Sequence, residues 1–137
     1  MVIDTSAVMA ILLGEAEAET FAVTIEGDPT RLMSAASVFE SAFVIESRKG
    51  PAGGREFDLL LHRAQVEVVP FTREQFEVAR DGWRRFGKGR HAAGLNMGDC
   101  FSYALAVTSG EPLLFKGDDF GLTDIGVVLP RGEAGDC

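Results

Sequence analysis

Short apolar runs alternate along the chain with longer segments in which apolar residues recur every three or four positions. The short runs predict strands at 2–3, 32–33, 66–71, 113–115 and 127–129. The periodic segments predict helices at 7–13, 15–26, 35–48, 55–64, 73–86 and 97–109. Strands that alternate with helices are typical of a parallel sheet covered by helices on both faces. We therefore expect an α/β fold of three layers, α/β/α, around a central, mostly parallel five-stranded sheet.

Polar and glycine residues mark the ends of several of these elements. Ser34 precedes an apolar-periodic segment and is a good helix N-cap, and Thr72 with Gln75 three residues later forms a capping-box pattern. Gly110 is placed to end a helix. The glycine- and proline-rich stretch 50–54 predicts a break between two helices, and the four glycines within 87–98 predict a loop.

The length of 137 residues is that of a single domain. We expect that domain to span 1–130 and to be followed by a flexible, polar C-terminal tail at 131–137. No apolar run approaches the ~20 residues that cross a bilayer, and the first residues carry no basic segment of a secretory signal. A cytoplasmic protein without a membrane partner is expected. Cys100 and Cys137 lack the neighbouring Cys or His residues of a zinc site.

The charge distribution is uneven. The net charge of −8, from 13 basic and 21 acidic side chains, argues against a partner that is bound mainly through phosphates. Residues 80–91, however, contain five basic side chains and one acidic side chain, Asp81. A local track for nucleic acid is therefore compatible with the acidic composition.

Several carboxylates lie where an apolar element begins or ends, or inside an apolar helix. They are Asp4, Glu40, Asp99 and one of the pair Asp118 and Asp119. Each has a structural alternative, because acids cap helices and form turns, and a helical glutamate can face solvent. Their joint occurrence favours one site, since ligands of parallel sheets collect at the carboxyl ends of the strands and several buried acids need a cation. The pattern predicts a magnesium-dependent nuclease.

Four segments resemble the motifs of PIN-domain ribonucleases, specifically the VapC toxins of bacterial toxin–antitoxin modules. The opening residues 2–7 resemble the first motif, in which the aspartate binds metal and the hydroxyl residues support it. Residues 37–40 resemble the second motif, 87–106 the third and 113–125 the fourth. One departure concerns the fourth motif: many PIN domains have threonine or serine two residues before the acid, whereas here Lys116 and Gly117 precede two aspartates.

This resemblance implies an endoribonuclease toxin that cuts tRNA, rRNA or mRNA, arrests translation and growth, and is neutralised by a cognate VapB antitoxin. It implies Mg²⁺ or Mn²⁺ as cofactor and a homodimer that forms a hetero-oligomer with the antitoxin. The catalytic residues would be Asp4, Glu40, Asp99, Asp118 and Asp119, and the metal ligands would be Asp4 and Asp99 directly, with Glu40 and Asp118 acting through water. Of the two neighbouring aspartates, Asp118 is the one we favour. The substrate contacts would be Thr5, Ser6, Arg84, Lys88, Arg90, His91 and Asn96.

Two other functions are compatible with the residues. A catalytically silent PIN-like module would bind RNA or protein without cleavage, and the presence of acids in all four motifs argues against it. A metal-dependent phosphatase would also begin with an aspartate after a strand, but it normally requires Asp-x-Asp, and position 6 is serine.

Overall fold

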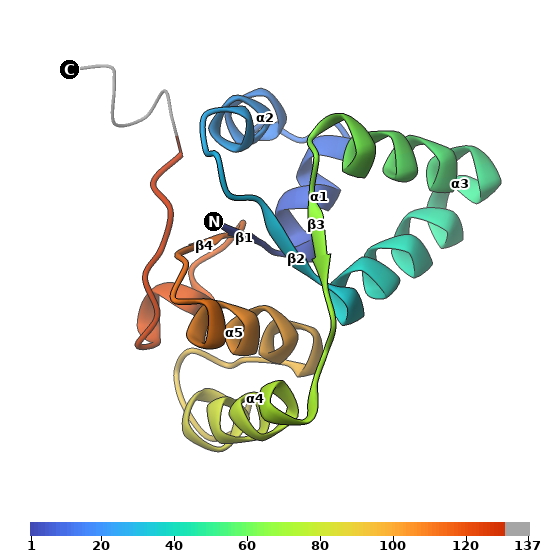
Figure 1. Cartoon of the computed structure of the whole chain (residues 1–137). Helices are drawn as coiled ribbons and strands as arrows, with labels where there is room; N and C mark the ends of the chain where they lie inside the picture. Colours follow the sequence, from blue (N-terminus) through green and yellow to red (C-terminus); the bar gives the residue numbers. More distant parts are fainter. Residues whose placement is uncertain (131–137) are drawn as a thin grey trace.

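A four-stranded parallel sheet lies at the centre of the molecule (Figure 1). The computed structural model describes residues 1–130, and the tail predicted at 131–137 lies outside the described residues. The strands are β1 (Val2–Ile3), β2 (Leu32–Ser34), β3 (Glu67–Val69) and β4 (Leu113–Leu114). Their order across the sheet is β3-β2-β1-β4, with Val2 opposite both Leu32 and Leu113. All carboxyl ends therefore meet at one edge.

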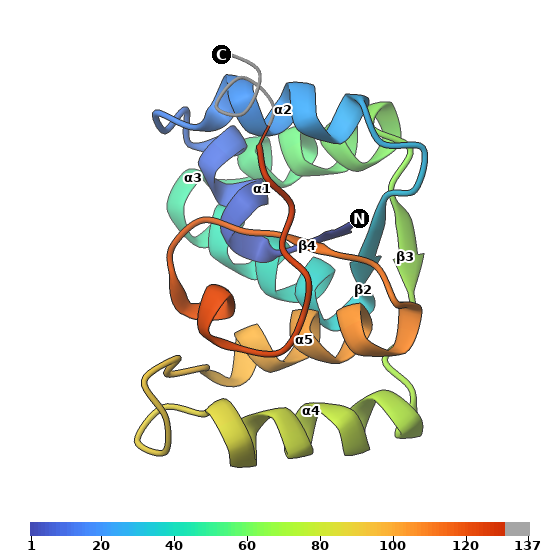
Figure 2. The same cartoon turned by 90° about the vertical axis from the view of Figure 1, so that its left-hand side faces the viewer.

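Helices cover both faces of this sheet (Figures 1 and 2). One face carries α1 (Thr5–Leu12), α2 (Ala18–Glu26) and α3 (Ala35–Arg63). The other face carries α5 (Met97–Ser109), with α4 (Arg73–Phe86) packed on its outer side. The alternation of side chains along a strand explains the two cores: Ile3 and Leu114 belong to the first, and Val2 and Leu113 to the second. The predicted three-layer α/β fold is confirmed.

The sheet has four strands rather than the predicted five. Residues 127–129 make a single bridge, in which Val127 pairs with Leu113 at the edge of β4. The pairing stops there because Val127 and Leu129 are 40% and 72% exposed and gain little from continuing along the sheet.

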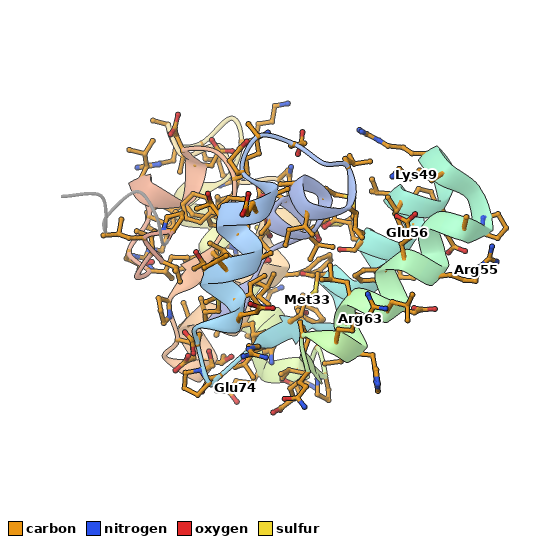
Figure 3. The ribbon with its side chains drawn as sticks, turned by 90° about the horizontal axis from the view of Figure 1, so that it is seen from above. Met33, Lys49, Arg55, Glu56, Arg63 and Glu74 are labelled. Atoms are coloured by element: carbon orange, nitrogen blue, oxygen red, sulfur yellow. The ribbon has the colours of Figure 1, made fainter. Side chains whose placement is uncertain are left out.

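The predicted break at 50–54 is confined to one residue. Gly50 adopts φ 66°, which folds α3 back on itself, and the helix resumes at Pro51, since proline suits the first turn of a helix. The two halves form an arm that projects from the molecule, and Lys49 and Glu56 form an ion pair of 3.8 Å near its tip (Figure 3). Among the helices of residues 1–130, none combines the length and the hydropathy needed to cross a bilayer.

Candidate active site

Asp4 is held by three hydrogen bonds at the end of β1. Its carboxylate Oδ2 accepts from the Ser6 backbone N–H at 3.0 Å and from Ser6 Oγ at 2.7 Å, which also makes Asp4 the N-cap of α1. Its Oδ1 accepts from the hydroxyl of Ser102 on α5. The side chain is only 4% exposed, so these donors compensate for the water that the carboxylate has lost.

The loop after β4 is tied to the same group. The backbone N–H of Lys116 donates to Ser6 Oγ at 2.9 Å, and the Lys116 ammonium forms ion pairs with Glu15 and Glu17 at 3.3 and 3.2 Å. Ser6 thus links Asp4 to the segment after β4, which carries Asp118 and Asp119.

Glu40 reaches the site from α3. Thr5 Oγ1 donates to Glu40 Oε1 at 2.8 Å, and Ser41 Oγ in turn donates to Thr5 Oγ1 at 3.2 Å. Burial raises the pKa of Glu40, the hydrogen bond from Thr5 opposes that rise, and the negative charge of Asp4 adds to it. Glu40 therefore does not simply face solvent from its helix, which was the alternative that the sequence left open.

The negative charges of the other acids act together on the carboxyl group of Asp99. Asp99 lies in the first turn of α5 and forms a capping box with Asn96: the Asn96 N–H donates to Asp99 Oδ2 at 3.0 Å, and the Asp99 N–H donates to Asn96 Oδ1 at 2.9 Å. The pKa of Asp99 is raised to about 6, chiefly by burial. The hydrogen bond from Asn96 opposes this rise, and the charges of Asp4, Asp119 and Glu40 contribute to it. Four acids from four elements therefore share one electrostatic environment.

Asp118 and Asp119, which follow β4, differ in their relation to Asp99. Gly117, with φ 112°, turns the chain, and Asp119 begins the short 3₁₀ helix η1 (Asp119–Leu122). The charge of Asp119 is among those that raise the pKa of Asp99. This electrostatic interaction is the reason to prefer Asp119 to Asp118, the residue favoured from the sequence.

The predicted substrate contacts occupy two kinds of position. Thr5, Ser6 and Asn96 hold the acids, as described above. His91 shapes its own loop, because its Nδ1 accepts from the Ala93 N–H at 3.0 Å and its ring packs edge-on against Phe86. Arg84, Lys88 and Arg90 are exposed along α4 and the loop after it.

Three residues near the acids were not identified from the sequence. Ser102 binds Asp4, Ser37 Oγ lies 3.5 Å from Ser102 Oγ, and Gly98 faces the Glu40 carboxylate. The one signal that points to Ser102 is its spacing of three residues from Asp99, which places both on neighbouring positions of a helix surface.

The donor set suits a hard cation. Within residues 1–130, no group of three or more His, Cys, Asp or Glu side chains is placed so that it could hold a metal ion. Magnesium does not require one, because it takes one or two carboxylates and keeps several waters. Mutually repelling carboxylates that raise the pKa of Asp99 supply the negative potential that such an ion neutralises. The oxygen-only site thus fits Mg²⁺ or Mn²⁺ and does not fit a thiolate–imidazole zinc centre.

Known proteins are similar to this chain over most of its length. The model of the PIN domain family matches residues 1–125. The chain is 59% identical over 128 residues to a protein named Ribonuclease VapC of Mycolicibacterium smegmatis, covering 93% of this chain and 99% of that protein. It is also 59% identical to Ribonuclease VapC30 of Mycobacterium tuberculosis, covering 93% and 98%.

Solved structures have the same fold at low sequence identity. The crystal structure of Mycobacterium tuberculosis VapC20, described as a sarcin-ricin loop cleaving toxin, superposes with a TM-score of 0.75 at 20% identity, covering 94% of this chain and 98% of that one. A toxin–antitoxin complex from Klebsiella pneumoniae superposes with a TM-score of 0.71 at 15% identity, covering 94% and 96%.

Proposed function

Because the chain belongs to the PIN domain family and, within it, to the VapC proteins, we propose that it is the endoribonuclease toxin of a VapBC-type toxin–antitoxin pair. The single observation that carries this proposal is the convergence of Asp4, Glu40 and Asp119 on Asp99. A structural protein gains nothing from acids gathered so closely that their charges raise the pKa of Asp99, whereas a site that binds a divalent cation needs that negative potential.

The proposed reaction is hydrolysis of an RNA phosphodiester bond. Water adds at phosphorus and the P–O3′ bond breaks, which leaves a 5′-phosphate and a 3′-hydroxyl. Bound Mg²⁺, or Mn²⁺ in its place, would lower the pKa of water and neutralise charge on the phosphate. Asp4 and Asp99 would hold the ion directly, and Glu40 and Asp119 would hold and orient water by accepting its protons in hydrogen bonds. Ser6, Ser102 and Thr5 would keep two of these carboxylates in place.

An antitoxin partner is proposed from the surface beside Glu40. Phe39 and Phe43 are 73% and 65% exposed, one helical turn apart, and therefore present an apolar strip on α3, the helix that carries Glu40. A VapB-type C-terminal segment could cover this strip and place an arginine among the carboxylates. The homodimer and the cytoplasmic location implied by the resemblance stay predictions.

The test is cleavage of total cellular RNA by the purified chain with Mg²⁺, with Mn²⁺, with chelator, and with Asp99→Asn. We expect discrete fragments that require metal, disappear in the variant and are suppressed by the cognate antitoxin. RNA that survives every metal while the protein still binds Mg²⁺ would instead favour a catalytically silent PIN-like module. Equal cleavage by Asp99→Asn would place the active site elsewhere or reveal a contaminating nuclease.

A further inference from the structure

Asp119 differs from the other acids of the candidate site in how it is held. The carboxylates of Asp4, Glu40 and Asp99 each accept a hydrogen bond from a neighbouring donor. Within residues 1–130, the exposed side chain of Asp119 accepts no hydrogen bond and forms no ion pair. The place of Asp119 near Asp99 therefore depends on how the backbone of its own loop is fixed.

The loop between β4 and η1 is fixed at its two ends rather than in its middle. At the far end Phe120 is 3% exposed, and its ring packs edge-on against Phe115 with the centroids 5.0 Å apart. In the middle, a β-carbon at Gly117 would face open space, and Asp119 is exposed. The near end of the loop is Lys116, which is exposed and therefore has to be held by polar contacts.

The backbone of Lys116 is tied to the hydroxyl that supports Asp4. The Lys116 N–H donates to Ser6 Oγ at 2.9 Å, and Ser6 Oγ donates to Asp4 Oδ2 at 2.7 Å. A hydroxyl has one proton, and Ser6 uses it for Asp4, so only a lone pair of Ser6 is left for the Lys116 N–H. A shift of Lys116 therefore disturbs the donor of Asp4 as well as the start of the loop.

The side chain of Lys116 is tied to the segment between α1 and α2. Its ammonium pairs with Glu15 Oε2 at 3.3 Å and with Glu17 Oε2 at 3.2 Å. The Glu17 side chain precedes α2 without capping it, so its carboxylate serves the ammonium instead. The segment is itself ordered, because the Glu15 N–H donates to the Ala10 carbonyl at 2.9 Å. Two carboxylates from a fixed segment thus hold one ammonium in one direction.

We propose that Lys116 is a positioning residue of the site. Its ammonium, held by Glu15 and Glu17, fixes the start of the loop so that the carboxylate of Asp119 stays near Asp99. Lys116 touches neither metal nor RNA in this role. The inference rests on the proposed ribonuclease function and deepens it, because it assigns the placement of the fourth acid to an ion-pair network outside the site.

Hydrogen exchange of the metal-free protein, followed by NMR, tests the loop without metal or RNA. Lys116→Met keeps the length of the side chain and removes its charge, and it should speed exchange of the backbone N–H at position 116 about 10-fold, as local opening becomes easier. Lys116→Arg keeps the cation and should exchange like the wild type. The double variant Glu15→Gln with Glu17→Gln should match Lys116→Met, and combining all three changes should add nothing further.

Magnesium binding tests the consequence for the acids. By isothermal titration with Mg²⁺ alone, Lys116→Met should bind about 10-fold more weakly than the wild type. At a low Mg²⁺ concentration kcat should fall by about the same factor with the KM for RNA unchanged, and excess Mg²⁺ should restore activity. The thermal midpoint should change little, because exposed ion pairs add little to stability.

Lys49→Met is the matched control. The Lys49 side chain is 41% exposed against 39% for Lys116, and its ammonium pairs with Glu56 and donates to the Leu12 carbonyl. The same charge is removed, but from the arm of α3 and not from the loop after β4. Hydrogen exchange at position 116, Mg²⁺ affinity and kcat should all stay at wild-type values.

Two results would overturn the proposal. A raised KM for RNA with unchanged Mg²⁺ affinity in Lys116→Met would make Lys116 a direct RNA contact. A lowered thermal midpoint with unchanged exchange at position 116 and unchanged Mg²⁺ affinity would reduce the ion pairs to a purely structural role. A wild type that binds Mg²⁺ and cuts no RNA would overturn the ribonuclease function alone, since hydrogen exchange and Mg²⁺ affinity still decide the role of Lys116.

Discussion

The carboxylate of Glu40 lies against the α-carbon of Gly98, so that a β-carbon at position 98 would come within 2.8 Å of Glu40 Cδ. Glycine here is a requirement of the active site rather than of the backbone, because Gly98 is an ordinary helical residue of α5. Gly98→Ala should push the flexible end of Glu40 aside at small cost in stability while lowering RNA cleavage about 10- to 100-fold, as expected for a displaced ligand.

Gly126→Ala is the matched control for this prediction, since a β-carbon there would make only ordinary contacts with Pro112 at 3.6 Å. RNA cleavage rates and thermal unfolding midpoints are measured for both variants, and only Gly98→Ala should lose activity. A Gly98→Ala protein with full activity would show that the position of Glu40 is unimportant.

The two adjacent aspartates after β4 should differ sharply in function. The charge of Asp119 contributes to the raised pKa of Asp99, so Asp119→Asn should lower cleavage about 10- to 100-fold and Asp118→Asn by much less. The two variants carry the same charge change one residue apart, and each controls for the other. The reverse order in single-turnover assays would restore the preference for Asp118.

Asp99 should make the metal-free protein less stable as pH rises. Its pKa is raised from 3.8 to about 6, chiefly by burial, so the folded state holds a proton that the unfolded state has already released between pH 4 and 6. Stability contributed by this group is full below pH 4 and is lost as pH rises through 6. Asp99→Asn removes the free-energy cost of ionising this partly buried carboxyl group. In chelator at pH 8 the variant should be more stable than the wild type by about 1–2 kcal/mol, allowing for partial solvent exposure.

Urea denaturation at pH 4 and pH 8 measures this difference directly. The variant should gain nothing at pH 4, and added Mg²⁺ should narrow the gap at pH 8 by stabilising only the wild type. Equal free energies of unfolding for the wild type and Asp99→Asn at pH 8 without metal would mean that the fold does not raise the pKa of Asp99.

Ser102 should matter to both stability and metal binding. Ser102→Ala leaves buried Asp4 Oδ1 without its hydroxyl donor, which should cost about 1–3 kcal/mol of folding free energy and weaken Mg²⁺ binding about 10-fold. Ser109→Ala on the same helix removes a hydroxyl that donates to the Leu105 carbonyl and accepts from the Glu111 backbone N–H, away from the acids, and should leave Mg²⁺ binding unchanged. Isothermal titration of both variants with Mg²⁺, under conditions where each is folded, would refute the role of Ser102 if the two affinities agreed.

Much of the fold was predictable because its signals are local. Ser34 and Thr72 cap the helices that were expected to follow them, and Gly110 ends α5 in the left-handed conformation that glycine favours. The prediction of a fifth strand was wrong because apolar residues 127–129 lie at the edge of β4 with exposed side chains. An apolar sequence pattern does not reveal that exposure.

The candidate site was predictable only in part. Asp4, Glu40 and Asp99 stood out because each breaks an apolar pattern or opens a helix, but the choice between Asp118 and Asp119 depends on the path of the turn at Gly117. Ser102 was missed as a support for Asp4 because its partner lies 98 residues away, and a buried helical serine has no sequence signature of its own. Long-range pairings of this kind come from the fold and not from any window of sequence.

The order of the strands in the sheet has a consequence for when the acids come together during folding. Asp4 accepts hydrogen bonds locally from Ser6, but Asp119 joins the site only when β4 has paired with β1 and η1 has followed. Pairings between such distant residues form late in folding. A folding chain therefore carries an incomplete set of acids until these late contacts form, so the proposed activity would arise only at the end of folding and a partly folded chain would be inert.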